Sequence, residues 1–186
     1  KNIKSFIKHG TTVLEAKSGY GLSVEDELKS LRVIRRLNEI SILDIIPTFL
    51  GAHAIPPEYE NAKEKYIKII CNEMIPKIAE EKLAVFCDVF CEEGYYNVQQ
   101  SQLILETAKR YGLLPRLHAD EFVDSGASEL AYNINAVSAD HLMAVSDEGI
   151  KRMAEKGTIA TLLPGTTLFL GKGIYADGRK MIDSDC

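Results

Sequence analysis

The amino-acid sequence predicts an α/β fold built on a parallel sheet. Short β-rich apolar runs alternate along the chain with longer stretches in which apolar residues recur at helical spacing, which is the pattern of successive βα units. The 186 residues are enough for one well-cored domain. They fall short, by about two βα units, of the roughly 250 residues of a complete eightfold barrel. Two architectures therefore remain open, a doubly wound open sheet and part of a βα barrel.

Six apolar runs are predicted to be strands, and they span residues 11–15, 45–50, 84–91, 113–117, 136–139 and 158–163. Five helical stretches lie between them. The first begins at Ser23, which with Asp26 resembles a capping box, and its apolar stripe consists of Leu28, Leu31, Ile34 and Leu37. The second spans about residues 58–82, where Pro76 should kink the helix or start a new one because proline cannot donate the interior hydrogen bond.

The remaining helices are bounded by capping residues. The third is predicted to begin at Asn97 and to stop at Gly112, and the fourth to follow Asp124 as a short, alanine-rich helix. The fifth starts at Ser146 and ends at a glycine, residue 157. The last segment, residues 171–186, is polar and irregular, and we expect it to be poorly ordered.

Composition and charge exclude several classes of protein. Lys and Arg number 22 against 27 Asp and Glu, and the net charge of −5 argues against a nucleic-acid binder. No apolar run approaches the roughly 18 residues of a membrane span, and the first residues form no signal peptide. Because none of the four cysteines forms a Cys-x-x-Cys pair, we expect buried, reduced thiols and a cytoplasmic location. The chain lacks an initiator Met, and we expect it to be part of a longer protein.

Three of the four histidines lie near the ends of predicted strands. His53, His118 and His141 each come just after an apolar run, whereas His9 lies in a Lys-rich segment typical of a solvated surface. In a parallel sheet the carboxyl ends of the strands meet at one edge, where such folds assemble their active sites. Position alone is also compatible with ordinary hydrogen-bonded histidines at the edge of the core.

Polar neighbours strengthen the case for a site. Glu121 follows His118 by three residues and stays near the same rim. Asp140 precedes His141, and because adjacent strand residues point to opposite faces, we expect Asp140 to be a supporting or structural partner. Tyr20 lies between two glycines that permit a tight turn, which would present its ring to the mouth of the site; a tyrosine that covers the core is equally compatible.

Imidazole and carboxylate groups together suit a zinc or iron site that activates water. A catalytic zinc ion usually takes three protein ligands. The chain has no His-x-His and no His-Glu-x-x-His, so we expect that it cannot build a complete metal shell alone.

In six stretches the sequence resembles the imidazolonepropionases of the amidohydrolase superfamily. These stretches are Glu15-Ala-Lys-Ser-Gly-Tyr-Gly-Leu22, Phe49-Leu-Gly-Ala-His-Ala54, Val89-Phe-Cys-Glu92, Arg116-Leu-His-Ala-Asp-Glu-Phe122, Ser138-Ala-Asp-His-Leu142 and Ala160-Thr-Leu-Leu-Pro-Gly165. Their order and spacing match across nearly the whole chain, which would correspond to a little under half of a full-length member. The resemblance implies a metal-dependent hydrolase of histidine degradation that opens the ring of 4-imidazolone-5-propanoate with water to give N-formimidoyl-L-glutamate.

The resemblance also implies the architecture of the enzyme. Residues 1–186 would form a partial (β/α)8 barrel domain with strands two to seven of eight, and the small β domain of the family would not be present in this chain. One Zn²⁺ or Fe³⁺ ion would be the cofactor, with further ligands outside the chain: a His-x-His pair before Lys1 and an Asp after Cys186. We expect a homodimer at full length.

Site roles follow from the resemblance residue by residue. His118 is implied as a metal ligand, and Tyr20 and His53 as substrate contacts. Glu121 is implied both to hold the substrate ring and to assist proton transfer, and His141 to orient or deprotonate the attacking water. Two alternatives stay open: a related deaminase acting on a purine-like ring, and a structural fragment without activity. We expect the isolated 186 residues to be inactive, and their open sheet edges to require a partner or neighbouring segments.

Overall fold

The computed structural model describes residues 2–171 and 173–186 and contains one six-stranded parallel sheet. Its strands are β1 (Val13–Lys17), β2 (Asp44–Ala52), β3 (Phe86–Cys91), β4 (Leu114–Ala119), β5 (Ser138–His141) and β6 (Ile159–Thr161). Each of the six predicted runs overlaps one of these strands. The predicted ends differ from the observed ones by at most two residues, as in 11–15 against Val13–Lys17.

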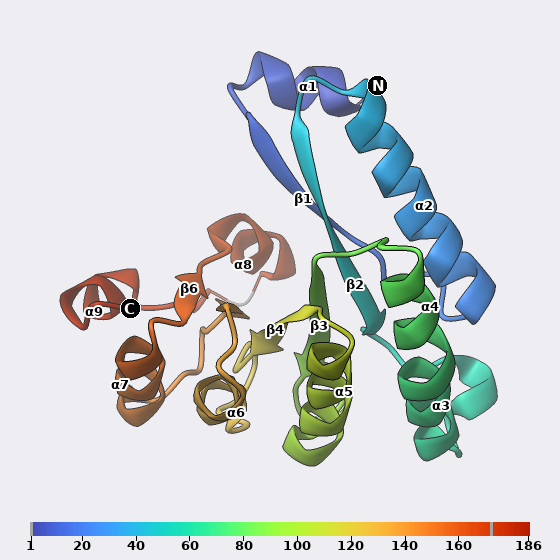
Figure 1. Ribbon diagram of the computed structural model, residues 1–186. Helices are drawn as coiled ribbons and strands as arrows, with labels where there is room; N and C mark the ends of the chain where they lie inside the picture. Colours follow the sequence, from blue (N-terminus) through green and yellow to red (C-terminus); the bar gives the residue numbers. More distant parts are fainter. Residues whose placement is uncertain (1, 172) are drawn as a thin grey trace.

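The strand order decides between the two predicted architectures. The strands lie side by side in their order along the chain, β1-β2-β3-β4-β5-β6, and all neighbours are parallel. A doubly wound sheet would reverse this order at a switch point, whereas a barrel keeps it. Figure 1 shows the strands in an arc with the helices from α2 to α7 along its outer side. The fold is therefore part of a βα barrel.

The first helices form where the capping signals predict them, and α1 (Asn2–Lys8) precedes β1. Helix α2 (Val24–Ile40) begins at Ser23, whose hydroxyl accepts a hydrogen bond from the backbone N–H of Asp26 at 3.1 Å. After β2 come the 3₁₀ turn η1 (Pro57–Tyr59), α3 (Lys63–Ile69), the π-helical turn η2 (Ile70–Met74) and α4 (Ile75–Glu80). Pro76 lies in the first turn of α4, where a missing N–H costs no hydrogen bond, so it starts a new helix as predicted.

The third and fifth predicted helices are confirmed at both ends. Helix α5 (Val98–Arg110) begins with a complete capping box formed by Asn97 and Gln100, and α7 (Asp147–Lys156) is capped by the Ser146 hydroxyl. Helix α6 (Ala127–Ile134) is the predicted short, alanine-rich helix, and it starts three residues after Asp124.

The C-terminal segment corrects the sequence prediction. Helix α8 (Pro164–Leu170) directly follows the predicted last strand run, and α9 (Gly178–Asp183) lies in the stretch that we expected to be irregular. The Asp177 carboxylate caps α9 by accepting from the backbone N–H of Lys180 at 3.0 Å, and the Met181 side chain is buried. One buried methionine is enough to anchor a short helix that is otherwise polar. Lys172 lies outside the described residues.

The hydrophobic core lies between the sheet and the helices that cover it. Helix α2 packs on β2, α5 packs on β3 and β4, and α6 packs on β4 and β5. Cys71, Cys87 and Cys91 are buried free thiols, as predicted, and Cys186 is partly exposed. Burial raises the pKa of Cys91 to about 11. Among the described helices, none combines the length and the apolar character that crossing a bilayer requires.

Candidate active site

The side chains singled out in the sequence come together at the carboxyl ends of the strands. His118 lies near the end of β4, His141 ends β5, and His53 directly follows β2. The imidazole centroids of His53 and His118 are 6.0 Å apart, and those of His118 and His141 are 5.1 Å apart. The Tyr20 ring, from the loop after β1, lies 4.9 Å from that of His53. The three histidines therefore share a rim, as predicted; the roles assigned to them remain predictions.

Glu121 pairs with one of these histidines. Its Oε1 lies 3.3 Å from Nδ1 of His141, and both side chains are buried. Burial and the neighbouring His118 imidazole lower the pKa of His141 to about 4. The same two causes, burial first, lower the pKa of His53. These surroundings favour the neutral form of both imidazoles, the form in which a ring nitrogen can accept a proton.

The backbone at the end of β5 corrects one step of the sequence argument. Strand alternation would point Asp140 and His141 to opposite faces. His141 and Leu142 instead have φ values of 77° and 58°, so the strand geometry ends at Asp140 and the chain turns. Asp140 faces the concave side, where it meets Lys17, and His141 still reaches His118. Asp140 is nevertheless a partner of buried cations, as expected for a supporting residue.

A network of charges lies on the concave side of the sheet, below the histidines. The Lys17 ammonium lies 2.7 Å from Oδ2 of Asp88 and 2.6 Å from Oδ2 of Asp140. Arg116 continues the network, with Nη1 2.8 Å from Oε1 of Glu15 and Nη2 3.4 Å from Oδ1 of Asp140. Burial alone would raise the pKa of Asp88, but His118 and Lys17 together hold it well below its ordinary value. The carboxylates of Asp88 and Asp140 conversely raise the pKa of Lys17 despite its burial.

Sequence reasoning missed Lys17 and Asp88. A signal was available for Asp88, a charged residue within the run 84–91 that is predicted to form a strand of a buried parallel sheet, whereas Lys17 lies two residues beyond the predicted run 11–15. A buried charge requires a partner, and in a parallel sheet the partner comes from another strand.

The donor set fits a metal ion at His118. Ligand atoms of Asp88, His118 and Asp140 all lie within 4.8 Å of one another, and nitrogen and oxygen donors suit zinc or iron. The Lys17 ammonium already lies between the two carboxylates, which favours a supporting role for them. Asp88 Oδ1 lies 3.0 Å from Nδ1 of His118. A carboxylate at one ring nitrogen orients a histidine, and the other nitrogen, here Nε2, would then be the one available to a metal ion.

Buried carboxylates also hold the loop that carries Glu121. Asp120 accepts hydrogen bonds from the backbone N–H groups of Ser125, Ala127 and Ser128 at 3.0–3.2 Å. Glu92, at the end of β3, accepts from the backbone N–H of Phe122 at 2.9 Å. The peptide that follows Glu121 is thereby tied to the neighbouring strand. Sequence analysis assigned no role to Asp120 or Glu92.

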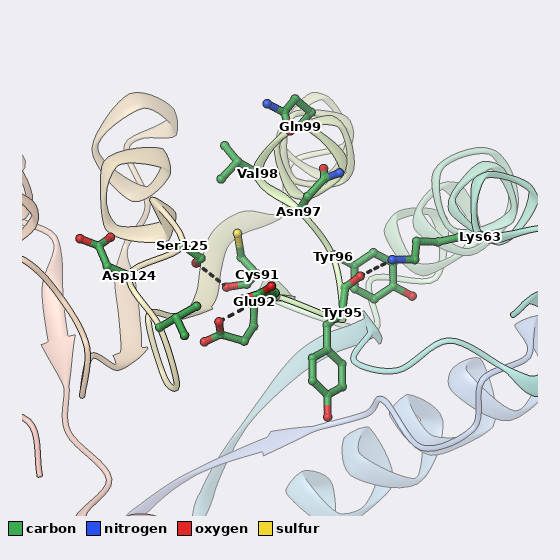
Figure 2. Close-up of a pocket in the computed structure, with 13 residues that line it drawn as sticks. Lys63, Cys91, Glu92, Tyr95, Tyr96, Asn97, Val98, Gln99, Asp124 and Ser125 are labelled. Atoms are coloured by element: carbon green, nitrogen blue, oxygen red, sulfur yellow. Dashed lines mark hydrogen bonds between the residues drawn. The ribbon is translucent and has the colours of Figure 1, made fainter. Parts of the chain in front are cut away.

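Two cavities lie along the loops that follow β3, β4 and β5, and no histidine among the described residues lines either of them. The larger, of about 490 Å³, lies between the loops after β3 and β4 and is bordered by Glu92, Tyr95 and Ser125 (Figure 2). The Tyr95 ring lies 4.1 Å from that of Phe90, whose own ring is 5.4 Å from His118. A second cavity of about 320 Å³ is bordered by Glu121, Phe122, Met143, Ala144 and Ile174. Of the candidate residues, only Glu121 borders one of these cavities, and that cavity has room for a small molecule.

Comparison with known proteins gives curated relatives of one kind. The chain is 52% identical over 183 residues to an imidazolonepropionase from Thermoanaerobacter pseudethanolicus, with 98% of the chain and 44% of the relative covered. It is 53% identical to that of Brevibacillus brevis, with 98% and 43% covered, and 55% identical to that of Clostridium tetani, with the same coverage. The chain thus spans a little under half of the length of the curated relatives it matches. No family model matches it.

Solved structures show the same fold at low identity. A guanine deaminase from C. acetobutylicum superimposes with a TM-score of 0.71 and 15% identity, covering 98% of this chain and 46% of that one. An adenine deaminase from Arthrobacter aurescens superimposes with a TM-score of 0.70 and 13% identity, covering 99% and 60%. The chain therefore shares its βα fold with these two deaminases.

Proposed function

We propose that this chain, which belongs by its sequence to the imidazolonepropionases, forms most of the catalytic rim of an enzyme that hydrolyses the cyclic amide of 4-imidazolone-5-propanoate to N-formimidoyl-L-glutamate in histidine degradation. One observation carries the proposal: His53, His118, His141 and Glu121 meet at the carboxyl ends of parallel strands in a sequence of this type. We assign residues 1–186 to the barrel domain of that enzyme.

His118 is the residue of this chain that would hold the metal, as one ligand of a Zn²⁺ or Fe³⁺ ion whose further ligands come from outside the chain. Asp88 supports this assignment because it fixes the imidazole through Nδ1. When bound, such an ion activates water at neutral pH and stabilises negative charge on the attacked carbonyl oxygen.

The chain's own residues bind the substrate and move the proton. In the hydrolysis the water oxygen joins the carbonyl carbon, the ring C–N bond breaks, and the departing nitrogen gains a proton. His141 is neutral and within reach of Glu121, so this pair can accept the proton from water and return it to the nitrogen. Glu121 also holds the ring by its N–H groups. His53 and Tyr20, which border the same space, contact the substrate.

The first test replaces the proposed proton carrier. In an intact enzyme that carries this sequence, Glu121→Gln keeps the shape of the side chain but cannot carry a proton, so kcat/KM should fall by about 100-fold or more. Glu129→Gln, an exposed position on α6, is the matched control and should leave kcat/KM unchanged. Substrate loss and formimidoylglutamate formation are followed together. A Glu121→Gln enzyme with wild-type kcat/KM would remove Glu121 from the reaction, and release of ammonia from a purine would favour the deaminase reading instead.

The second test concerns the metal ligand. His118→Ala should lower the metal content of the intact enzyme, measured by atomic emission after dialysis, from about one equivalent to near zero. His9→Ala, which changes an exposed histidine at the end of α1, controls for the loss of an imidazole and should leave the content unchanged. Retention of one full equivalent by His118→Ala excludes His118 as a ligand.

Location and assembly complete the proposal. Four free cysteines suit a reducing compartment, and we assign the enzyme to the cytoplasm. Leu168 and Phe169 on α8 are large, strongly exposed apolar side chains, which are typical of interaction surfaces and support a homodimer of the intact enzyme. Sedimentation equilibrium of the intact enzyme tests this assignment, and a monomer at micromolar concentration contradicts it.

A further inference from the structure

The loop between β1 and α2 holds Tyr20 over the mouth of the site in an unusual way. The Tyr20 side chain is 84% exposed, yet its ring lies 4.9 Å from that of His53. An exposed tyrosine on a surface loop normally samples several positions. The loop must therefore be fixed from below if Tyr20 is to stay beside His53.

Glu27, in the first turns of α2, fixes the backbone on both sides of Tyr20. Its buried carboxylate accepts three backbone N–H groups: Gly19 at 2.9 Å through Oε2, and Gly21 at 2.8 Å and Leu22 at 3.0 Å through Oε1. Each is a charge-assisted hydrogen bond, which is shorter and stronger than a neutral one. One side chain thus holds the residues that come directly before and after Tyr20.

The backbone of this loop also packs closely against its neighbours. Gly19 has φ of +115°, and a Cβ there would lie 2.7 Å from the carbonyl oxygen of Leu50 on β2. A Cβ at Gly21 would lie 2.7 Å from backbone atoms of Asp26 and Glu27 on α2. Ser18, just before the loop, accepts from the backbone N–H of Leu50 at 3.1 Å. The loop is therefore wedged between a strand end and a helix start.

Burying the Glu27 carboxylate to hold this loop is energetically unfavourable on its own. Its desolvation costs free energy that the hydrogen bonds must offset, and an apolar side chain at the same place would leave the three N–H groups without this acceptor. What Glu27 adds over an apolar residue is a defined conformation of the peptides around Tyr20.

We propose that Glu27 is a positioning residue for the substrate: it acts through Tyr20, which it holds beside His53 in the geometry that receives the ring of the cyclic amide. The inference rests on the proposed function and adds a residue to it. Because the hydrogen bonds of Glu27 fix a substrate contact and do not touch the residues that move protons, its loss should weaken substrate binding while the chemical step is retained.

A double-mutant cycle in the intact enzyme tests this. Glu27→Gln keeps the size of the side chain but has one oxygen in place of two, so it loses at least one of the three hydrogen bonds. It should raise KM about tenfold and leave kcat within about twofold. Tyr20→Ala should raise KM in the same direction. In the double variant Glu27→Gln should add nothing to the effect of Tyr20→Ala, because a residue that acts through Tyr20 has no effect once that ring is gone.

The matched control is Glu25→Gln, which removes a negative charge from the same turn of α2 at an exposed position and should leave both kinetic constants unchanged. A second measurement does not depend on activity. Amide hydrogen exchange of Gly19, Gly21 and Leu22 should be slow in the wild type and faster in Glu27→Gln, or in Glu27→Asp if the first variant does not fold.

The outcomes distinguish the fixing of the loop, the action through Tyr20 and the proposed function. Fast exchange of these amides in the wild type overturns the claim that Glu27 fixes the loop around Tyr20. Slow exchange with additive effects of Glu27→Gln and Tyr20→Ala on KM, or a loss confined to kcat, overturns the action through Tyr20 and leaves the proposed function intact. A wild-type enzyme that binds and converts no imidazolone propanoate overturns the proposed function, and the positioning role with it, even where the exchange data show that Glu27 fixes the loop.

Discussion

At the scale of single residues, buried charge organises the concave side of the sheet. Lys17 reaches Asp88 and Asp140, which lie 71 and 123 residues further along the chain. Asp88 in turn contacts His118 at the rim. The position of the rim histidine therefore depends on a lysine three strands away in the sequence order, whose ammonium lies between two buried carboxylates.

Removing this ammonium should cost stability. Lys17→Met keeps much of the length of the side chain but leaves Asp88 and Asp140 facing each other, so the free energy of unfolding should fall by about 3 kcal/mol. Lys29→Met on the exposed face of α2 is the control and should change it by about 0.5 kcal/mol or less. Urea denaturation of the intact enzyme, followed by circular dichroism, measures both. Equal stability of Lys17→Met and the wild type would show that Arg116 alone balances the two carboxylates.

The common location of the three rim histidines was predictable from the sequence, and the pairing of the charged residues below them was not. Placing His53, His118 and His141 at one rim required only that each follow an apolar run in a parallel sheet. Pairing Lys17 with Asp88 requires the register of strands that are not neighbours in the sequence, and no local pattern holds that information. The departure of His141 from strand alternation has another cause, a left-handed backbone at the last residue of β5.

At the scale of elements, the sequence was most informative where a cap uses side chains close together along the chain. Asn97 and Gln100 are three residues apart, and their reciprocal hydrogen bonds of 2.9 Å and 3.2 Å start α5 where expected. Helix α9 went unpredicted because its anchor is tertiary: Met181 is buried by residues distant along the chain. The π-helical turn Ile70–Met74 likewise has no local signal beyond the proline that follows it.

The cap of α5 gives a prediction at this scale. Asn97→Ala removes the acceptor for the Gln100 N–H and should lower the free energy of unfolding by about 1 kcal/mol. In a domain of this size the melting temperature should fall by about 2–4 °C. The control is Gln99→Ala, at an exposed position two residues after Asn97. It should leave the melting temperature unchanged or slightly higher because alanine favours helix. Differential scanning calorimetry of both variants decides, and equal melting temperatures would mean that the capping box contributes nothing.

At the scale of the whole molecule, the pattern of strands and helices left barrel and doubly wound sheet open, and the resemblance to a known family implied the barrel, which the structure confirms. The two folds share their local patterns, alternating strands and helices, and differ only in whether the strand order reverses. The observed order β1 to β6 without reversal is a property of the assembled sheet, and it also determines the location of the site, since only this order brings the ends of β2, β4 and β5 around one concave face (Figure 1).

The same order leaves two open edges within the part of the chain that the structure describes. There β1 pairs with β2 alone and β6 with β5 alone, and the edge strands carry exposed apolar side chains, Val13 at 56% and Ile159 at 60%. Unpaired backbone N–H and C=O groups beside apolar side chains are a template for strand addition. Produced as 186 residues without neighbouring segments, the chain should therefore self-associate, and sedimentation velocity at micromolar concentration should show species larger than 20.7 kDa.

Charged side chains at these edges should reverse the effect. Val13→Lys with Ile159→Lys places an ammonium on each edge strand, which opposes strand addition, and should raise the monomer fraction. Val33→Lys, an equally exposed apolar position on α2 away from the edges, is the matched control and should not change it. The control matters because any added lysine raises solubility to some degree. If the wild-type chain sediments as a stable monomer, the open edges are harmless in solution; if all three lysine positions act alike, association proceeds through general apolar contact and the sheet edges have no special part in it.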